Sequence, residues 1–117
     1  MQLRERQVEG AMVIDLSGEG IGSEPSILKA LVTSLLERGH RYIVLNAEHL
    51  QNMDSTCLAE IVASYKATVA AGGLLKMASA NPPVRRVMNV TKVNTFVVIY
   101  DSEAEAIASF DHSQRRA

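Results

Sequence analysis

The feature that most constrains the fold is a short apolar run, Tyr42-Ile43-Val44-Leu45, which lies between two segments with helical periodicity. A continuous run of β-favouring residues is typical of a strand whose two faces are both buried. On either side, apolar residues recur at helical spacing within Pro25–Arg38 and from Leu58 to Val69. Strands that are joined through a helix run parallel in one sheet. The run therefore predicts a central strand of a sheet that is covered by helices.

The other β-favouring segments add strands to this sheet. Glu9-Gly10 separates the first two of them, a spacing that predicts an antiparallel hairpin. The expected strands besides the central one are Leu3–Val8, Ala11–Leu16, Leu74–Ala78 and Phe96–Tyr100. A hairpin followed by alternating strands and helices predicts an α/β domain, with a central mixed β-sheet of about five strands covered by about four helices.

The predicted helices after the central strand carry their own boundary signals. The second helix is expected to end at Gly72-Gly73, and a third and short one begins at Pro82-Pro83. Ser102 followed by Glu105 is a capping-box pattern for a fourth helix that ends near Phe110. The expected inward-facing residues are Leu58, Ile61, Val62, Tyr65 and Val69 in the second helix, and Val84, Val87 and Met88 in the third.

Composition excludes several classes of function. The chain has 117 residues, a formal net charge of -1 and one cysteine. The near balance of charge argues against broad binding of nucleic acid, which normally needs a basic face. We find no apolar run near the roughly 18 residues of a membrane span and no secretion signal, so we expect no membrane insertion and a cytoplasmic protein. The histidines, His40, His49 and His112, have no zinc-like spacing, and we expect no metal and no cofactor.

Two features suggest sites that have ordinary alternatives. Gly18, Gly20 and Gly22 fall between a predicted strand and a predicted helix, where a dinucleotide-binding loop would lie, but Ser23 stands where the motif needs its third glycine. An ordinary loop is the alternative. Cys57 lies at a helix start, where the pKa of a thiol is lowered and its reactivity increased. The alternative is a small packing residue.

The segment from Met53 to Leu58 is the most informative part of the chain, because it joins the central strand, expected to end near Asn46, to the second helix. Asp54 is the expected N-cap, whose carboxylate would accept from backbone N–H groups, with Met53 and Leu58 as a hydrophobic staple. Ser55 then takes the first helical position with its hydroxyl toward solvent, where a phosphate is tolerated. The alternative is that these polar residues only start the helix.

This segment belongs to a longer pattern that resembles the STAS family, specifically its stand-alone bacterial anti-sigma factor antagonists. Met53-Asp54-Ser55-Thr56-Cys57-Leu58 is similar to the family motif D-S-[ST]-G-L, and Gly72-Gly73-Leu74-Leu75-Lys76 is similar to its G-G-x-[LM]-x turn. Further similar segments are Arg41–Asn46, which resembles the central strand, and Val90–Val93 and Tyr100–Ala106, which resemble the C-terminal pattern. The resemblance covers nearly the whole chain. We expect a STAS domain over 1–111 and a disordered tail over 112–117.

The resemblance implies a binding switch that catalyses nothing. In such proteins the dephosphorylated antagonist binds an anti-sigma factor that is also a serine kinase; the kinase phosphorylates the serine after the motif aspartate, and a serine phosphatase resets it. By position that serine is Ser55. The residues expected to contact the partner are Met53, Asp54, Ser55, Thr56, Cys57, Leu58 and Glu19. The alternative is a scaffold or adaptor that binds proteins without phosphorylation, and a homodimer is compatible with either function.

Two positions depart from the family pattern. Cys57 stands where the motif has Gly, so we expect a side chain to project from the first turn of the helix toward an approaching partner. The segment Gly18-Glu19-Gly20-Ile21-Gly22 begins like the family's G-E-[LIV]-D segment but lacks its aspartate. Both departures bear on the expected partner contacts.

Overall fold

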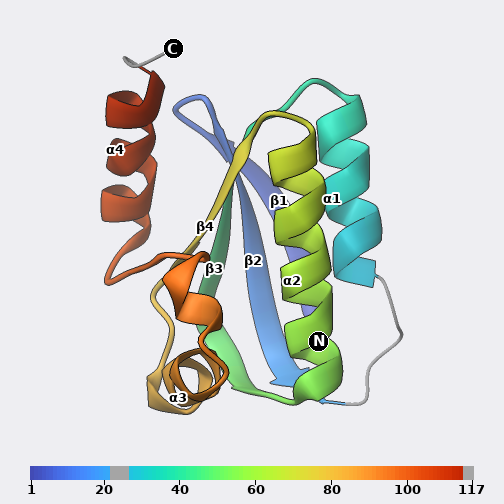
Figure 1. Ribbon diagram of the computed structural model, residues 1–117, viewed down its shortest axis with the longest axis vertical. Coiled ribbons are helices and arrows are strands. Elements are labelled where there is room, and N and C mark those ends of the chain that lie inside the picture. Colours follow the sequence, from blue (N-terminus) through green and yellow to red (C-terminus); the bar gives the residue numbers. More distant parts are fainter. Residues whose placement is uncertain (22–26, 115–117) are drawn as a thin grey trace.

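A five-stranded mixed sheet forms the centre of the fold (Figure 1). The structure, a computed structural model, describes residues 1–21 and 27–114. The strands are β1 (Gln2–Val8), β2 (Ala11–Gly20), β3 (Tyr42–Met53), β4 (Leu74–Ala78) and β5 (Ile99–Tyr100), which lie in the sheet in chain order. β1 is antiparallel to β2, and the other neighbours are parallel. The predicted α/β class is confirmed.

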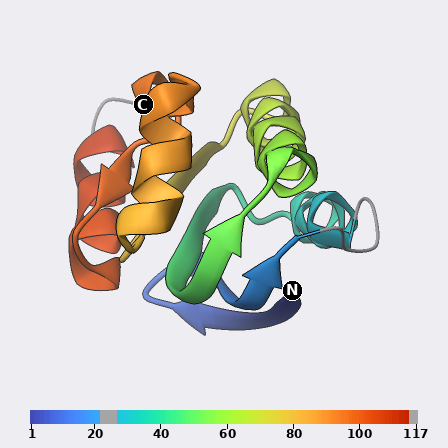
Figure 2. The ribbon, with the colours of Figure 1, turned by 90° about the horizontal axis from the view of Figure 1, so that it is seen from below.

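Helices cover the two faces of the sheet unequally (Figures 1 and 2). α1 (Ile27–Glu37) and α2 (Ser55–Ala70) lie side by side on one face, whereas α4 (Glu103–Gln114) lies on the other face, over β3 and β4. α3 (Pro82–Val90) and a short 3-10 helix, η1 (Val93–Thr95), lie together at one end of the sheet. The prediction of four helices is confirmed, and the helices of the described residues leave part of one sheet face uncovered.

Successive residues of the inner strands alternate between two hydrophobic cores. In β2, Ile14 and Leu16 belong to the core beneath α1 and α2, whereas Val13 belongs to the core beneath α4. In β3, Leu45 faces the first core and Val44 the second. Because successive side chains of a strand point to opposite faces, a strand covered on both sides is apolar at every position. The central strand that begins at Tyr42 is therefore confirmed.

The predicted hairpin joins β1 to β2. Val8 pairs with Ala11 across a two-residue turn, Glu9-Gly10. Both turn residues have positive φ, 49° at Glu9 and 84° at Gly10. This is the backbone of the two-residue turns that match the twist of antiparallel strands, and glycine adopts it without steric cost.

β2 and β3 are longer than their hydrophobic patterns predicted. The sequence predicted ends near Leu16 and Asn46, whereas β2 continues to Gly20 and β3 to Met53. The additional residues pair with each other, with two irregularities in register. Backbone hydrogen bonds extend the two strands through largely polar segments, in which the buried Ala47, Leu50 and Met53 are spaced too widely to give the alternation of a strand.

The last strand is shorter than predicted. Only Ile99–Tyr100 of the expected Phe96–Tyr100 pairs with the end of β4. η1 ends just before Phe96, and Val97 is fully buried in the main core. The apolar run thus reflects burial of a connecting segment, with the strand confined to its last two residues.

The inward face of α2 also differs from the prediction. Of the predicted stripe only Ile61 is fully buried; Val69 is 46% exposed and the other three residues are half-buried. The fully buried positions include Ser64 and Thr68, whose hydroxyl donates to the carbonyl oxygen of Ser64 at 2.8 Å. α2 packs against α1 on one side and the sheet on the other. These two contacts determine which side of α2 is buried. The half-buried Leu58, Val62 and Tyr65 lie at one edge of that side.

α3 forms as the sequence predicted. Asn81 is its N-cap and accepts a hydrogen bond from the backbone N–H of Val84 at 3.0 Å, followed by proline in the first turn. Val84 and Met88 are buried and Val87 is half-buried. The predicted inward side of this helix is confirmed.

α4 begins at its predicted cap but ends later than predicted. The Ser102 hydroxyl accepts from the backbone N–H of Glu105 at 3.1 Å, which confirms that Ser102 caps the helix. The helix continues to Gln114, beyond the expected end near Phe110. It therefore takes in the first three positions of the predicted tail over 112–117, and 115–117 lie outside the described residues.

Candidate functional site

The junction between β3 and α2 consists of a single residue, Asp54. β3 ends at Met53 and α2 begins at Ser55. Asp54 has an extended backbone, with φ -100° and ψ -178°, and its Oδ1 accepts from the backbone N–H of Cys57 at 2.9 Å. The carboxylate thereby satisfies a helix N–H that has no partner within the helix. The prediction that Asp54 is the N-cap is confirmed.

Two hydroxyl side chains lie at the surface beside this cap. Ser55 is the first residue of α2, and both Ser55 and Thr56 are exposed. Met53 is buried, and Leu58 packs against the core cluster that contains it, as expected for a hydrophobic staple. Because the N-terminus of a helix carries partial positive charge, an anion attached to either hydroxyl is compatible with the fold.

The end of β2 lies against the same junction. The carbonyl oxygen of Gly20 accepts from the backbone N–H of Asp54 at 2.8 Å. Glu19, one residue earlier, has an exposed side chain. In Figure 1 the end of β2 and the start of α2 lie next to each other at the lower end of the molecule. The structure thus brings Glu19 and Ser55, which come from different motifs, to one corner.

Gly18 and Gly20, the two described glycines of the glycine-rich segment, do not form the loop that a dinucleotide-binding site requires. Gly18 and Gly20 are residues of β2 and pair with β3. A phosphate-binding loop needs free backbone N–H groups between a strand and a helix. The interpretation of these two glycines as a loop is therefore wrong, and Gly22 lies outside the described residues.

Cys57 points into the protein and not toward a partner. Its exposed fraction is 0%, so the expectation that it projects from the first turn is wrong. Burial raises the pKa of the Cys57 thiol to about 11, with smaller contributions from the negative charges of Glu60 and Asp54. The helix N-terminus would lower this pKa, but desolvation of the thiolate dominates. Of the two alternatives, a reactive thiol and a small packing residue, Cys57 is the packing residue.

The space for Cys57 is provided by Gly20. A Cβ atom at position 20 would lie 3.0 Å from the Cys57 sulfur and 2.7 Å from the carbonyl oxygen of Asn52. Gly20 occupies the aliphatic position of the G-E-[LIV]-D segment, and Cys57 occupies the glycine position of D-S-[ST]-G-L. Gly20, one residue before the position of the missing aspartate, is thus a further departure from the family pattern, and it lies against Cys57. A side chain is lost on β2 and another is gained on α2.

A shallow apolar groove runs along α2 from Ser55. Its volume is about 350 Å³, and α2 supplies the lining. The lining residues are Ser55, Leu58, Ala59, Val62, Ala63 and Lys66. These positions repeat at intervals of three and four, so they form one face of the helix. The groove extends the surface around Ser55 along the helix axis.

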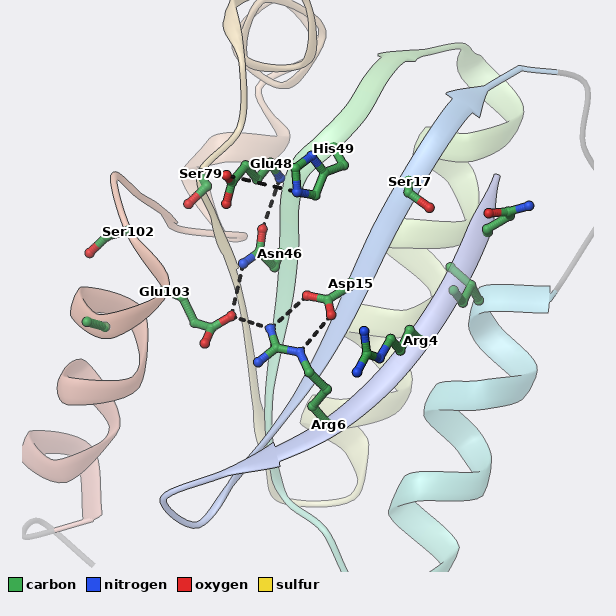
Figure 3. Close-up of a pocket in the computed structure, with 13 residues that line it drawn as sticks. Arg4, Arg6, Asp15, Ser17, Asn46, Glu48, His49, Ser79, Ser102 and Glu103 are labelled. Carbon is green, nitrogen blue, oxygen red and sulfur yellow. Dashed lines mark hydrogen bonds and ion pairs between the residues drawn. The ribbon is translucent and has the colours of Figure 1, made fainter.

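A second and larger cleft lies on the sheet face opposite α1 and α2 (Figure 3). Its volume is about 750 Å³, and its walls come from β1, β2, β3 and the start of α4. We call it the sheet cleft. Sequence reasoning missed it, although β2 carries a signal: Ala11 and Val13 are apolar, whereas Asp15 and Ser17, further along the same face, are polar. This change marks the point at which α4 no longer covers the sheet.

A charged network crosses the floor of the sheet cleft (Figure 3). The Arg6 guanidinium donates to both carboxylate oxygens of Asp15, at 2.6 and 2.7 Å, and to Oε1 of Glu103 at 2.6 Å. The amide of Asn46 donates to the same Glu103 oxygen at 2.9 Å. Arg6 is thereby committed to linking β1 and β2 to the first turn of α4. These hydrogen bonds raise the pKa of Arg6 and hold the pKa of Glu103 below its ordinary value.

Acid is expected to weaken this link. The lowered pKa of Glu103 means that its carboxylate stabilises the fold fully above the unfolded value of about 4.3, and that this contribution is lost as pH falls through the lower folded value. Glu103→Gln should cost about 1–2 kcal/mol at pH 7 and reduce the loss of stability between pH 5 and pH 2. Urea unfolding at several pH values measures both quantities. Glu105→Gln, an exposed change in the same turn, is the control and should leave the acid-induced loss unchanged.

The residues that the structure describes contain neither a candidate metal site nor a membrane-spanning helix. In residues 1–21 and 27–114 we find no group of three or more His, Cys, Asp or Glu side chains that could hold a metal ion. No helix in this part of the chain is both long and apolar enough to cross a bilayer. His49 is exposed beside Glu48, at 4.0 Å, and lines the sheet cleft.

Comparisons with known proteins identify the family. The model of the STAS domain family matches residues 2–106. The chain belongs to the STAS family. It is 28% identical to the anti-sigma F factor antagonist of Paenibacillus polymyxa over 112 residues, which cover 95% of this chain and 96% of that protein. It is 32% identical over 79 residues to a Thermotoga neapolitana protein named as a homologue of the anti-sigma factor antagonist TM1081, covering 68% of this chain and 70% of the other.

Solved structures of STAS proteins share the fold. The Bacillus cell fate determinant SpoIIAA, in its phosphorylated form, superposes with a TM-score of 0.72 at 20% identity, covering 93% of this chain and 99% of that one. At this identity the likeness shows the fold alone. It supports the single STAS-like domain that the sequence predicted, while the limits of the domain over 1–111 stay a prediction.

Proposed function

We propose that this STAS protein is an anti-sigma factor antagonist whose binding is switched by phosphorylation of Ser55. The observation that carries the proposal is the position of Ser55, exposed at the first residue of α2 and directly after the N-cap Asp54. Relatives that align over most of the chain are named anti-sigma factor antagonists. A structural neighbour, SpoIIAA, exists in a phosphorylated form, which supports a modification of this kind.

The fold tolerates a phosphate at Ser55. The group adds about -1.5 to -2 charges at neutral pH. At the exposed start of α2 an anion gains about 0.3–1 kcal/mol from the helix dipole. The Asp54 carboxylate already occupies the N–H of Cys57, so the phosphate does not have to displace the cap. Phosphorylation should therefore leave the free protein folded.

The phosphate has the opposite effect on a complex with a partner, which it destabilises. Binding would bury the surface around Ser55, and the phosphate would then lose water next to the Asp54 carboxylate. An unpaired buried charge costs about 3–5 kcal/mol. This weakens binding by a factor of roughly one hundred to several thousand, which is enough to release the partner. The switch thus acts on the complex and leaves the fold in place.

The proposal assigns the chemistry to other proteins. The partner is an anti-sigma factor that is also a serine kinase, and a serine phosphatase restores the hydroxyl of Ser55. The antagonist itself is a substrate and catalyses nothing. The contact residues are the exposed or half-buried ones around the cap: Glu19, Asp54, Ser55, Thr56 and Leu58. Met53 and Cys57 support them from within, and the complex forms in the cytoplasm.

Phosphate transfer tests the assignment directly. The protein is incubated with candidate anti-sigma factor kinases and ATP, and the modified residue is located by mass spectrometry. We expect one phosphate, on Ser55, and none in Ser55→Ala. Phosphate on Thr56 alone would move the acceptor by one residue. A partner that binds tightly and transfers no phosphate would support a constitutive adaptor instead.

A charged substitution at Ser55 should separate binding from stability. We expect Ser55→Asp to weaken binding of the anti-sigma factor at least tenfold while changing the free energy of unfolding by less than about 1 kcal/mol. The matched control is Thr33→Asp, the same charge change at an exposed position of α1. Calorimetric titration gives the affinities and urea unfolding the stabilities. Equal affinities for the two variants would contradict an electrostatic switch.

A further inference from the structure

We infer that the sheet cleft is a binding site for a small organic anion that also carries hydroxyl groups, a sugar phosphate or a hydroxycarboxylate, whose anionic group binds to Arg4. The cleft lies on the sheet face opposite α2, the helix that begins with Ser55 (Figure 3). The inference therefore does not rest on the proposed function. It adds a small ligand to a protein for which the proposed function names only protein partners.

The cleft lies where two strands of the sheet end and two continue. β2 and β3 extend beyond the last residues of β4 and β5. Asn46, which pairs with Ala78 at the end of β4, lines the cleft. Ser79, directly after β4, and Ser102, after β5, line it as well. In open α/β sheets, ligands bind in crevices outside the carboxyl ends of the strands. The volume of about 750 Å³ also lies in the range of about 300–1,000 Å³ that is typical of sites for small molecules.

Arg4 is a cation of the cleft that has no counter-charge of its own. It lies directly opposite Asp15 in the pairing of β1 with β2. Opposite charges at such positions stabilise a sheet by pairing, but here Arg6 donates to both oxygens of Asp15. Within the described part of the chain Arg4 has no hydrogen-bond or ion-pair partner, and its exposed side chain lines the cleft (Figure 3). A guanidinium binds phosphate or carboxylate oxygens through two parallel hydrogen bonds, so an anion fits here.

The carboxylates of the cleft are compensated or lie at its rim. Arg6 donates to Asp15 and to Oε1 of Glu103, and this oxygen accepts from Asn46 as well. The two arginines of the cleft balance these two carboxylates, so the floor has no net charge that would repel an anion. The third carboxylate, Glu48, has a side chain that is 62% exposed, where water screens its charge.

The remaining polar atoms of the cleft indicate that the ligand also carries hydroxyl groups. Oε2 of Glu103 and the hydroxyl of Ser17 have no hydrogen-bond partner among the described residues. A carboxylate oxygen only accepts hydrogen bonds, whereas a serine hydroxyl donates or accepts, so hydroxyl groups of a ligand satisfy both. The described residues that line the cleft include no phenylalanine, tyrosine or tryptophan, on which the base of a nucleotide would stack. The lining therefore favours a small anion without a base.

Binding is tested on the full chain with small probes. Glucose 6-phosphate and citrate represent the two sources of a hydroxylated anion, glucose carries hydroxyl groups without charge, and inorganic phosphate carries charge without the sugar. Amide signals in a heteronuclear NMR titration locate the site. We expect glucose 6-phosphate or citrate to shift the signals of Ser17, Asn46 and Glu103 and to bind at least tenfold more tightly than glucose and inorganic phosphate.

Substitution of Arg4 separates a ligand contact from a structural role. Arg4→Gln should lower the affinity for the bound probe at least tenfold and leave the urea midpoint of unfolding unchanged, because the Arg4 side chain is exposed. Arg4→Lys keeps the charge but loses the paired hydrogen bonds, so its affinity should lie between those of Arg4→Gln and the wild type. Lys29→Gln, the same loss of charge at an exposed position of α1, is the control and should bind like the wild type.

Several results would overturn the inference. They are the absence of amide shifts with both hydroxylated anions at millimolar concentration, wild-type affinity in Arg4→Gln, and tighter binding of ATP than of either anion. Inorganic phosphate that binds as tightly as the larger anions would indicate an adventitious ion only, and this would overturn it too. Each of these results leaves the assignment of Ser55 untouched, because phosphate transfer to Ser55 is measured separately by mass spectrometry.

Discussion

Gly73→Ala is expected to cause the largest loss of folding stability among the substitutions considered for this protein. Gly73 is buried between α2 and β4, and its backbone N–H donates to the carbonyl oxygen of Thr68 at 2.9 Å. A Cβ atom there would overlap the carbonyl oxygen of Arg41 and lie 3.1 Å from its Cα. That same carbonyl accepts from the N–H of Leu74 at 2.8 Å, where β3 and β4 begin to pair. Neither backbone can move without breaking this start of the sheet.

The neighbouring glycine provides a matched control. Gly72 has φ +86°, and a Cβ atom at this position would have no heavy atom of the described residues within 4 Å, so Gly72→Ala adds backbone strain without a clash. We expect about 1–2 kcal/mol for Gly72→Ala and about 3 kcal/mol or more for Gly73→Ala. For a domain whose total stability is about 5–15 kcal/mol, the second change threatens folding itself. Urea unfolding followed by circular dichroism compares the two, and equal losses would contradict the close approach of Arg41.

The second large effect is expected at the contact between β2 and α2. Gly20→Ala should cost about 2 kcal/mol, because the new methyl group meets the Cys57 sulfur at 3.0 Å and the Asn52 carbonyl oxygen at 2.7 Å. Cys57→Gly should cost a similar amount, since it leaves a cavity and adds glycine to a helix. The double variant is expected to lose less than the sum of the two changes, because Cys57→Gly removes the sulfur that the new methyl group at position 20 would crowd, and this methyl group fills part of the cavity that the sulfur leaves.

A double-mutant cycle measures this coupling. Stabilities of the wild type, both single variants and the double variant are obtained from urea unfolding under one set of conditions. We expect a favourable interaction energy of about 0.5–1 kcal/mol, with the contact to Asn52 left unrelieved. Strict additivity would mean that Gly20 and Cys57 are independent departures from the family pattern. Cys57→Ser, which keeps the volume and adds a stronger polar group, checks that size and not the thiol is responsible.

Local chemistry explains what the sequence could predict. The hairpin at Glu9-Gly10 needs only two residues that accept positive φ, and the cap at Asp54 needs only a carboxylate before a helical pattern. The run that begins at Tyr42 can be recognised as a central strand from the sequence alone, because burial on both faces demands apolar residues throughout. Each of these features is determined within a few residues of chain.

Features that depend on distant segments could not be predicted. The direction of the Cys57 side chain depends on the missing side chain of Gly20 on another strand, so a motif on α2 alone suggested the wrong environment. The polar network of Arg6, Asp15 and Glu103 joins three elements, and it forms because α4 covers only part of the sheet face. The predicted lengths of β2 and β3 were too short for the same reason. The two strands keep pairing beyond the continuous apolar runs from which their ends were predicted.

The buried position of Cys57 gives the molecule a natural reporter of its own motion. It is the only thiol in the chain, and both its burial and its pKa of about 11 suppress the thiolate that reagents attack. Labelling at neutral pH must therefore pass through states in which the neighbours of the Cys57 sulfur, the end of β2 and Met1, move away from it. The labelling rate then follows the opening of the corner that presents Ser55. Changes in that opening, on docking or on phosphorylation, become measurable in the unmodified sequence without an added probe.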